Sequence, residues 1–466
     1  MVYTMPEFLE RRYNPQSRTI LSVISLVSYV LTKVAVTVYA GGLVFQQVFG
    51  IKELWGIDFF WIAAIGLVVL TALYTIFGGM KSVLYTSVLQ TPILLLGSLI
   101  ILVLGFKELG GWDEMMRVCG AVTVNDYGDT MTNLIRSNDD ANFPWLGALI
   151  GSAIIGFWYW CTDQFIVQRV LSGKNEKEAR RGTIFGAYLK LLPVFLFLIP
   201  GMIAFALHQK YIGAGGEGFL PMLANGTANA DAAFPTLVAK LLPAGVKGLV
   251  VCGILAALMS SLASLFNSSA MLFTIDFYKR FRPETPEKKL VGIGQIATVV
   301  IVILGILWIP IMRSVGDVLY TYLQDVQSVL APGIAAAFLL GICWKRTSAQ
   351  GGMWGLIAGM IIGLTRLGAK VYYSNAGEVA DSTFKYLFYD MNWLFFCGWM
   401  FLFCIIVVIV VSLATEAPTA EKIQGLVFGT ATKEQKAATR ASWDHWDIIH
   451  TVIILAITGA FYWYFW

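Results

Sequence analysis

Long apolar segments recur along the whole chain and constrain its fold more than any other feature. A helix that crosses the hydrocarbon core of a bilayer needs about 20 largely apolar residues, at about 1.5 Å of rise per residue. We therefore predict an all-α integral membrane protein with a single transmembrane domain over residues 1–466. Eleven segments meet the length requirement: 19–48, 57–78, 83–106, 144–170, 182–208, 245–278, 290–312, 316–343, 350–372, 392–413 and 447–466.

The composition agrees with this class and excludes several others. Hydrophobic residues make up 57% of the chain and charged residues 13%, outside the range of soluble proteins. The net charge of +4 is small and predicts no nucleic-acid partner. The six cysteines form no CxxC pair, the three histidines lie far apart, and no catalytic triad or phosphate loop stands out. We predict no enzyme activity and no organic cofactor; the oligomeric state is left open.

Basic residues fall on every second connecting loop. Arg11 and Arg12 precede the first span, and further clusters lie within 174–181 and 279–289. The loop 107–143, rich in Asp and Glu, belongs to the opposite side. Because basic loops face the cytosol, this alternation predicts a multi-pass protein of the plasma or inner membrane, with residue 1 inside and Trp466 outside.

Polar residues interrupt the apolar segment 144–170. Its string Phe157-Trp158-Tyr159-Trp160-Cys161-Thr162-Asp163-Gln164 places a carboxylate within the membrane, which costs roughly 2.5–3.5 kcal/mol on insertion. Polar groups at such depth usually line a pocket or a pathway, and we interpret the chain as a transporter. The alternative is that Asp163 caps or braces helices.

Lys190 lies about eight residues into the fifth span, roughly 12 Å deep. Its ammonium group would bind either a polyhydroxylated ligand or the carboxylate of Asp163, and the sequence leaves both interpretations open.

Small and polar residues recur at spacings of three and four on the sixth span, so that they share one helical face. On spacing alone, close helix packing is favoured. The other interpretation is a Na⁺ site, with hydroxyl ligands and one backbone carbonyl. The residues on this face are Gly253, Ala257, Ser260, Ser261, Ser264, Asn267 and Ser268.

The eighth span contributes Gln324, whose amide can both donate to and accept from a sugar hydroxyl. Pro332-Gly333 predicts a kink or break in the same span. Tyr320 and Trp160 could stack on a sugar face, although most aromatic side chains of such a chain face lipid or the interface.

Several strings resemble the sodium/glucose cotransporter branch of the sodium:solute symporter family over essentially the whole chain. The Trp-Tyr-Trp-Cys-Thr-Asp-Gln string is specific to the sugar branch, whereas the serine pair on the sixth span is shared with symporters of other solutes. The matching strings are Tyr3 to Phe8, Trp158 to Gln164, Val167 to Arg169, Tyr188 to Pro193, Met259 to Ser268, Pro332 to Ile334 and Trp344 to Arg346.

The resemblance implies a LeuT-type bundle of two inverted five-helix repeats with 14 helices, of which about 11 are present here. Residues 1–106 would be the remainder of the first repeat, 144–344 the second, and 350–466 peripheral helices. Three helices precede the Tyr3 to Phe8 segment in the family. We therefore expect an N-terminally truncated piece that does not carry out coupled transport by itself, with a groove bordered by Tyr159, Lys190, Ser261 and Gln324.

The resemblance also implies site residues for the Na⁺-coupled symport of a hexose or related polyol. Tyr159 and Tyr320 would close the site toward the cytosol and the outside. The alternatives are a symporter of another solute, such as myo-inositol or an organic anion, and a non-transporting sugar sensor. The implied Na⁺ ligands are Ala257, Ser260 and Ser261; the implied substrate-binding residues are Lys190, Gln324, Tyr159 and Trp160; further intramembrane polar residues are Asp163, Gln164 and Asn267.

Three departures from the family pattern bear on coupling and substrate. Ser87 stands where the family usually has Asp in a Tyr-Thr-Asp string, which puts cation handling in question. Gly156 replaces an amide one turn before the gate tyrosine, so the sugar is open. Ala263 lacks the hydroxyl of relatives that bind two Na⁺, which favours one Na⁺ per sugar.

Overall fold

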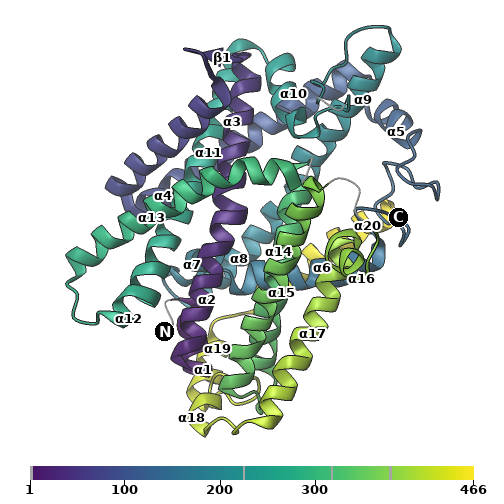
Figure 1. Cartoon of the computed structure of the whole chain (residues 1–466). Helices are drawn as coiled ribbons and strands as arrows, with labels where there is room; N and C mark the ends of the chain where they lie inside the picture. The colour runs from purple at the N-terminus through teal and green to yellow at the C-terminus, as the bar shows by residue number, and fades with distance from the viewer. Residues whose placement is uncertain (1–3, 224–225, 316–317, 377–379, 466) are drawn as a thin grey trace. The chain divides into compact units, whose positions relative to one another are not determined.

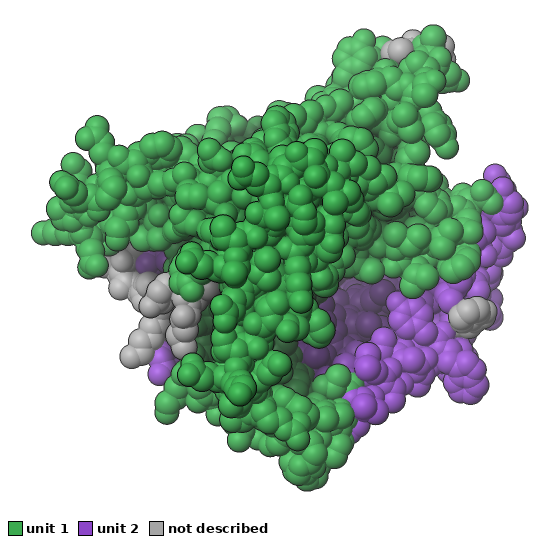
Figure 2. All heavy atoms as spheres, turned by 90° about the horizontal axis from the view of Figure 1, so that it is seen from below, with its two compact units in different colours: residues 1–35, 138–184, 268–451 green, residues 36–137, 185–267, 452–466 purple. Residues whose placement is uncertain are grey.

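The computed structural model of the chain describes residues 4–223, 226–315, 318–376 and 380–465. Helices account for nearly all regular structure, and the one paired sheet of the described residues joins Glu53–Leu54 (β1) to Ile57–Asp58 (β2). The expected all-α architecture is confirmed. The chain divides into two compact units, unit 1 with residues 1–35, 138–184 and 268–451, and unit 2 with residues 36–137, 185–267 and 452–466 (Figure 2).

Unit 1 is built from helices of the N-terminal, central and C-terminal parts of the chain (Figure 1). These elements are α1 (Met5–Arg12), α2 (Pro15–Ser28), η1 (Tyr29–Val34), α6 (Trp145–Phe157), η2 (Trp158–Thr162), α7 (Gln164–Leu171), η5 (Leu272–Tyr278), α12 (Lys279–Phe281), α13 (Glu287–Val315), α14 (Leu319–Cys343), α15 (Ala349–Asn375), α16 (Thr383–Lys385), η6 (Tyr386–Asp390), α17 (Trp393–Ala414), α18 (Ala420–Ile423) and α19 (Lys433–Ala441).

Small residues let the helices α14, α15 and α17 pack closely at the centre of unit 1. A Cβ added to Gly333 of α14 would lie 2.9 Å from the Cα of Gly359 on α15, so neither position has room for a side chain. Of the predicted kink or break at Pro332-Gly333, the break is wrong, because α14 continues through both residues from Leu319 to Cys343, and the kink stays a prediction. The glycine serves helix contact instead.

Unit 2 contains the remaining helices and the short hairpin. A buried cluster that includes Ile101, Met115, Ile203 and Leu237 forms its core. Three helices are divided between the units, α8 (Glu176–Pro193), α11 (Ala244–Met271) and α20 (His445–Tyr464), and the first residue of a fourth, Ala35 of α3, belongs to unit 1. The other elements of unit 2 are α3 (Ala35–Phe49), α4 (Phe59–Leu109), α5 (Trp112–Gly120), η3 (Val194–Leu198), α9 (Ile199–Gly213), η4 (Ala230–Ala232) and α10 (Ala233–Leu241).

The helix α4 joins two segments that we expected as separate spans, 57–78 and 83–106. It runs over 51 residues with Pro92 inside. Between the two expected spans the sequence holds no proline, and the single charge of Lys81 does not interrupt the ladder of backbone hydrogen bonds. Among the described residues, ten helices are long and apolar enough to cross a membrane, and Phe59–Leu73 is a shorter apolar stretch. A multi-pass membrane protein is confirmed.

Short π-helical segments interrupt the α-helices where polar residues enter the apolar spans. In unit 1, η1 carries Lys33, η2 carries Tyr159 and ends just before Asp163, and η5 carries Asp276. One extra residue in a helical turn changes the direction of the following side chains, and such turns are frequent at functional sites. These four polar side chains of unit 1 are therefore presented by irregular helix turns or directly beside them.

Candidate functional site

The intramembrane carboxylate Asp163 stands at a break between two helical segments. The π-helix η2 ends at Thr162, and Asp163 itself has an extended backbone with φ −77° and ψ 118°. Its side chain then accepts a hydrogen bond from the backbone N–H of Phe165 at 3.1 Å and caps α7. The helix-capping alternative that the sequence left open is thus the observed contact of Asp163.

Lys33 of η1 forms a buried ion pair with Asp163. The hydroxyl of Tyr29 donates to the same carboxylate at 3.2 Å and accepts from the backbone N–H of Phe165 at 3.0 Å. The Lys33 ammonium also lies 4.2 Å from the ring centre of Phe165 and 5.4 Å from that of Tyr159. The charge of Asp163 is therefore compensated inside unit 1, and the compensating cation contacts the proposed gate residue.

Lys33 is absent from the site residues that we predicted from the sequence. Its signal is one ammonium within the apolar run Tyr29 to Val38, which is as costly in a membrane as the carboxylate of Asp163. Two intramembrane charges of opposite sign on different spans are expected to pair. The sequence could have suggested the pair, but not the choice of Lys33 over Lys190 as the partner of Asp163.

Gln164, the next residue, connects α7 to the start of the chain. Its side-chain oxygen accepts from the backbone N–H of Met5 at 2.9 Å, and its nitrogen lies 3.8 Å from the sulfur of Met271. Gln164 is 1% exposed, so this contact is protected from water. The segment from Tyr159 to Gln164 is thereby held by both α1 and η1.

The aromatic residues expected at the site are less buried than the charges. Tyr159 is half-buried and Trp160 is 50% exposed, and their rings meet edge to face with centres 5.1 Å apart. On α14, the amide nitrogen of Gln324 donates to the hydroxyl of Tyr320 at 2.9 Å. Tyr320 is 56% exposed, whereas Gln324 is half-buried. All four residues belong to unit 1.

The residues expected to bind Na⁺ lie on α11 within unit 2. Ser260 is buried, and Ala257 and Ser261 are half-buried. The hydroxyl of Ser260 lies 2.6 Å from that of Ser87 on α4, and its carbonyl accepts from Ser264 at 2.9 Å. The residue that replaces the family carboxylate therefore contacts an expected Na⁺ ligand directly.

Lys190 and Asn267 complete the set of expected polar residues in unit 2. Lys190 lies on α8 and is exposed, and the half-buried Asn267 lies near the end of the unit-2 part of α11. The expected groove between Tyr159, Lys190, Ser261 and Gln324 takes residues from both units and stays a prediction. Over the described residues, no group of three or more His, Cys, Asp and Glu side chains could hold a metal ion.

Comparison with known proteins places this arrangement of residues in context. Residues 1–359 match the model of the sodium:solute symporter family. The sodium/mannose cotransporter SLC5A10 of Bos taurus is 35% identical over all of this chain and 80% of its own length. The sodium/myo-inositol cotransporter 2 of Homo sapiens is 35% identical over 92% of this chain, and the sodium/glucose cotransporter 1 of Ovis aries is 37% identical over 89%.

The chain spans 64% of the length of each of the latter two relatives. Among solved structures, a Na⁺-coupled sialic acid symporter in a substrate-bound outward-open state superimposes with a TM-score of 0.65. That comparison covers 89% of this chain and 78% of the other, at 22% sequence identity. The fold is thus that of a Na⁺-coupled symporter, in agreement with the expected LeuT-type bundle.

Proposed function

The chain belongs to the sodium:solute symporter family, and on this premise we propose that it couples Na⁺ movement down its gradient to uptake of a hexose or related polyol. The observation that carries the proposal is the similarity, over 89–100% of the chain, to relatives named for mannose, myo-inositol and glucose. Transport would proceed by alternating access, in which one bundle moves against the other around a midplane site.

The side chains of α11 fit a coupling ion that must bind and leave in every cycle. Neutral oxygens of Ser260 and Ser261, with the carbonyl of Ala257, would hold Na⁺ without the strong attraction of a carboxylate. On α14, the amide nitrogen of Gln324 already donates to Tyr320. The Gln324 amide oxygen would then accept from a sugar hydroxyl, and Lys190 would donate to another.

Tyr159 and Trp160 would cover the sugar from the cytosolic side. The supporting observation is their place at the helix interruption that ends at Asp163, because backbone that departs from a regular helix is tolerated at membrane depth where it lines a cavity or is buried in protein. The ion pair of Lys33 with Asp163 would keep this interruption in one arrangement while the bundle moves.

The test is uptake of labelled glucose, mannose and myo-inositol into proteoliposomes under an inward Na⁺ gradient. An inward K⁺ gradient of equal size is the matched control. We expect accumulation of at least one substrate above its outside concentration with Na⁺ only. Sugar-stimulated Na⁺ currents without accumulation would indicate the sensor alternative, and equal uptake under both gradients would contradict Na⁺ coupling.

A further inference from the structure

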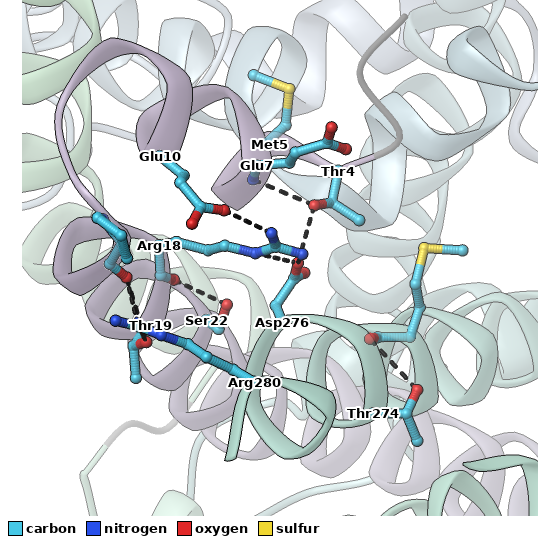
Figure 3. A network of polar contacts seen from close by, with 12 residues as sticks. Thr4, Met5, Glu7, Glu10, Arg18, Thr19, Ser22, Thr274, Asp276 and Arg280 are labelled. Atoms are coloured by element: carbon cyan, nitrogen blue, oxygen red, sulfur yellow. Dashed lines mark hydrogen bonds and ion pairs between the residues drawn. The ribbon is translucent and has the colours of Figure 1, made fainter. Parts of the chain in front are cut away.

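A second buried carboxylate, Asp276, lies in η5, which begins at the residue after α11 ends. Its side chain is 0% exposed and accepts from Arg18 of α2 through Nε at 2.8 Å and Nη2 at 2.5 Å (Figure 3). The hydroxyl of Thr4 donates to the same oxygen, Oδ1, at 3.1 Å. Neither the proposed ion site nor the proposed sugar site uses this carboxylate.

Arg18 connects three helical segments at once. Besides Asp276, it donates to Glu10 of α1 through Nη1 at 2.6 Å. Arg280 of α12 donates back to Pro15 and Thr19 at the start of α2 (Figure 3). The segment η5–α12 is therefore held to α1 and α2 from both directions, within unit 1.

The two residues at the start of α1 reach two different functional segments. Thr4 caps α1 by accepting from the backbone N–H of Glu7 at 3.2 Å, and it donates to Asp276. The adjacent Met5 donates its backbone N–H to Gln164, which follows the proposed gate segment. The short helix α1 thus contacts both η5, which follows the proposed Na⁺ ligands of α11, and Gln164, which follows the proposed sugar gate.

Stability alone is a poor reason for this network. Burying an ion pair costs desolvation energy that its attraction often only just repays, so a pair of apolar side chains would hold the helices as well. The Oδ2 atom of Asp276 is buried and has no hydrogen-bond partner among the described residues. An ion pair with one unsatisfied oxygen is suited to a contact that has to open.

We propose that Arg18 and Asp276 form a latch that couples the two ligand sites, and that this latch opens during transport. Both are positioning residues, because they act through α1 and η5 and not on the ion or the sugar. The latch stands beside the basic residues Arg11, Arg12 and Arg280, which the positive-inside rule assigns to the cytosolic side. The proposal rests on the proposed symport function, because it supplies the coupling that symport needs.

The test compares Arg18→Gln, Asp276→Asn and the double variant with wild type. Each single variant leaves a buried charge without its partner and is expected to lose thermal stability, whereas the double variant recovers it. Coupling is measured as the factor by which sugar lowers the half-saturating Na⁺ concentration, which for allosteric systems is about 5–150. We expect this factor to fall toward one in the double variant. Recovery of both stability and coupling would overturn the latch and leave a structural pair.

Arg11→Gln is the matched control, since Arg11 lies on the neighbouring helix α1 and pairs with Glu7 at 2.6 Å on the exposed side. It should leave the coupling factor unchanged. A second measurement does not depend on transport: spin labels at Arg11 and Lys288, in a background without the native cysteines, report the distance between α1 and α13. We expect the double variant to shift this distance distribution without ligands. An unshifted distribution overturns the latch, whereas absent uptake in wild type contradicts only the proposed function.

Discussion

The two units hold their membrane-embedded polar groups in different ways. In unit 1 the groups are charged and paired, as Lys33 with Asp163 and Arg18 with Asp276. In unit 2, the contact between α4 and α11 joins two neutral hydroxyls, Ser87 and Ser260. Removing one partner of a buried ion pair leaves an uncompensated charge at a high cost in free energy, whereas a hydroxyl exchanges one hydrogen-bond partner for another at a low cost. On the proposed function, the difference separates residues that position helices from residues that would bind and release an ion.

Two buried carboxylates of unit 1 stand in or beside a π-helical turn, η2 for Asp163 and η5 for Asp276. A third, Asp325, pairs with Lys370 and lies on the helix α14. Irregular turns expose backbone groups that charged side chains can satisfy, as Asp163 does at the N–H of Phe165. Ser260 lies on α11 and Ser87 on α4, both of which are α-helical at these residues.

The largest effect should follow from removing the charge of Lys33. Lys33→Met leaves the carboxylate of Asp163 buried without its cation, at a cost of about 3–5 kcal/mol in the free energy of unfolding. Adding Asp163→Asn keeps a cap for α7 and should recover most of this loss. Thermal unfolding in detergent gives both values. If the double variant loses the sum of the stability losses of the two single variants, the two residues do not depend on each other.

The next effect concerns sugar binding by one residue of each unit. Lys190→Ala loses a charged donor and should weaken sugar binding by about 1.5–3 kcal/mol, which raises the half-saturating sugar concentration roughly 10- to 150-fold. Gln324→Ala loses a neutral hydrogen bond and should weaken sugar binding by about 0.5–1.5 kcal/mol. Uptake kinetics with sugars deoxygenated at single positions provide the check. A deoxy-sugar that loses as much in the variant as in wild type does not contact the substituted residue.

A smaller effect is expected at Ser87. Ser87→Ala removes the hydroxyl that faces Ser260 and should cost about 0.5–1.5 kcal/mol of stability. Ser87→Asp introduces the missing charge into unit 2, and we expect it to lower the half-saturating Na⁺ concentration while slowing turnover. Equal Na⁺ dependence in Ser87→Asp and wild type would show that the hydroxyl contact has no part in ion binding.

The smallest effect belongs to a carboxylate outside the spans. The backbone N–H of Ser137 and the amide of Asn125 hold the pKa of Asp129 below its ordinary value. Its stabilisation is therefore complete above the ordinary pKa of Asp, about 3.9, and is lost only as the pH falls through the lowered value. Hydrogen exchange at Ser137, corrected for intrinsic rates, should show constant protection from pH 7 to pH 5. Loss of protection within that range contradicts this assignment.

Much of the fold could be predicted from the sequence, because apolar runs of sufficient length must form membrane helices. The polar character of the string from Trp158 was visible as well, and helix capping by Asp163 was one of two interpretations, but the end of the helical segment at Thr162 was not predicted. It was harder to predict where a helix continues without a break. The helix α4 continues through Lys81, and α14 continues through Pro332. Neighbouring helices and the remaining backbone hydrogen bonds tolerate one charge or one proline.

The sequence alone could not show which charged residues of the site form ion pairs with each other. Arg18 and Asp276 are 258 positions apart, and Lys33 and Asp163 are 130 apart. Each charge could have been noticed by its position in or near an apolar run. The choice of partner depends on which helices pack together, and this information comes only from the folded chain.

The central claim is that the neutral oxygens of α11 bind the coupling ion, and one titration tests it most directly. Na⁺ dependence of sugar uptake is measured for wild type, Ser261→Ala and Ser269→Ala. Ser269 is a matched control, because it is a buried serine on the same helix. We predict that, of the two substitutions, Ser261→Ala alone weakens Na⁺ binding, by about 0.5–1.5 kcal/mol. This loss raises the half-saturating Na⁺ concentration roughly 2- to 13-fold and leaves sugar selectivity unchanged. Equal half-saturating Na⁺ concentrations in all three proteins would contradict the claim and assign the serines of α11 to helix packing.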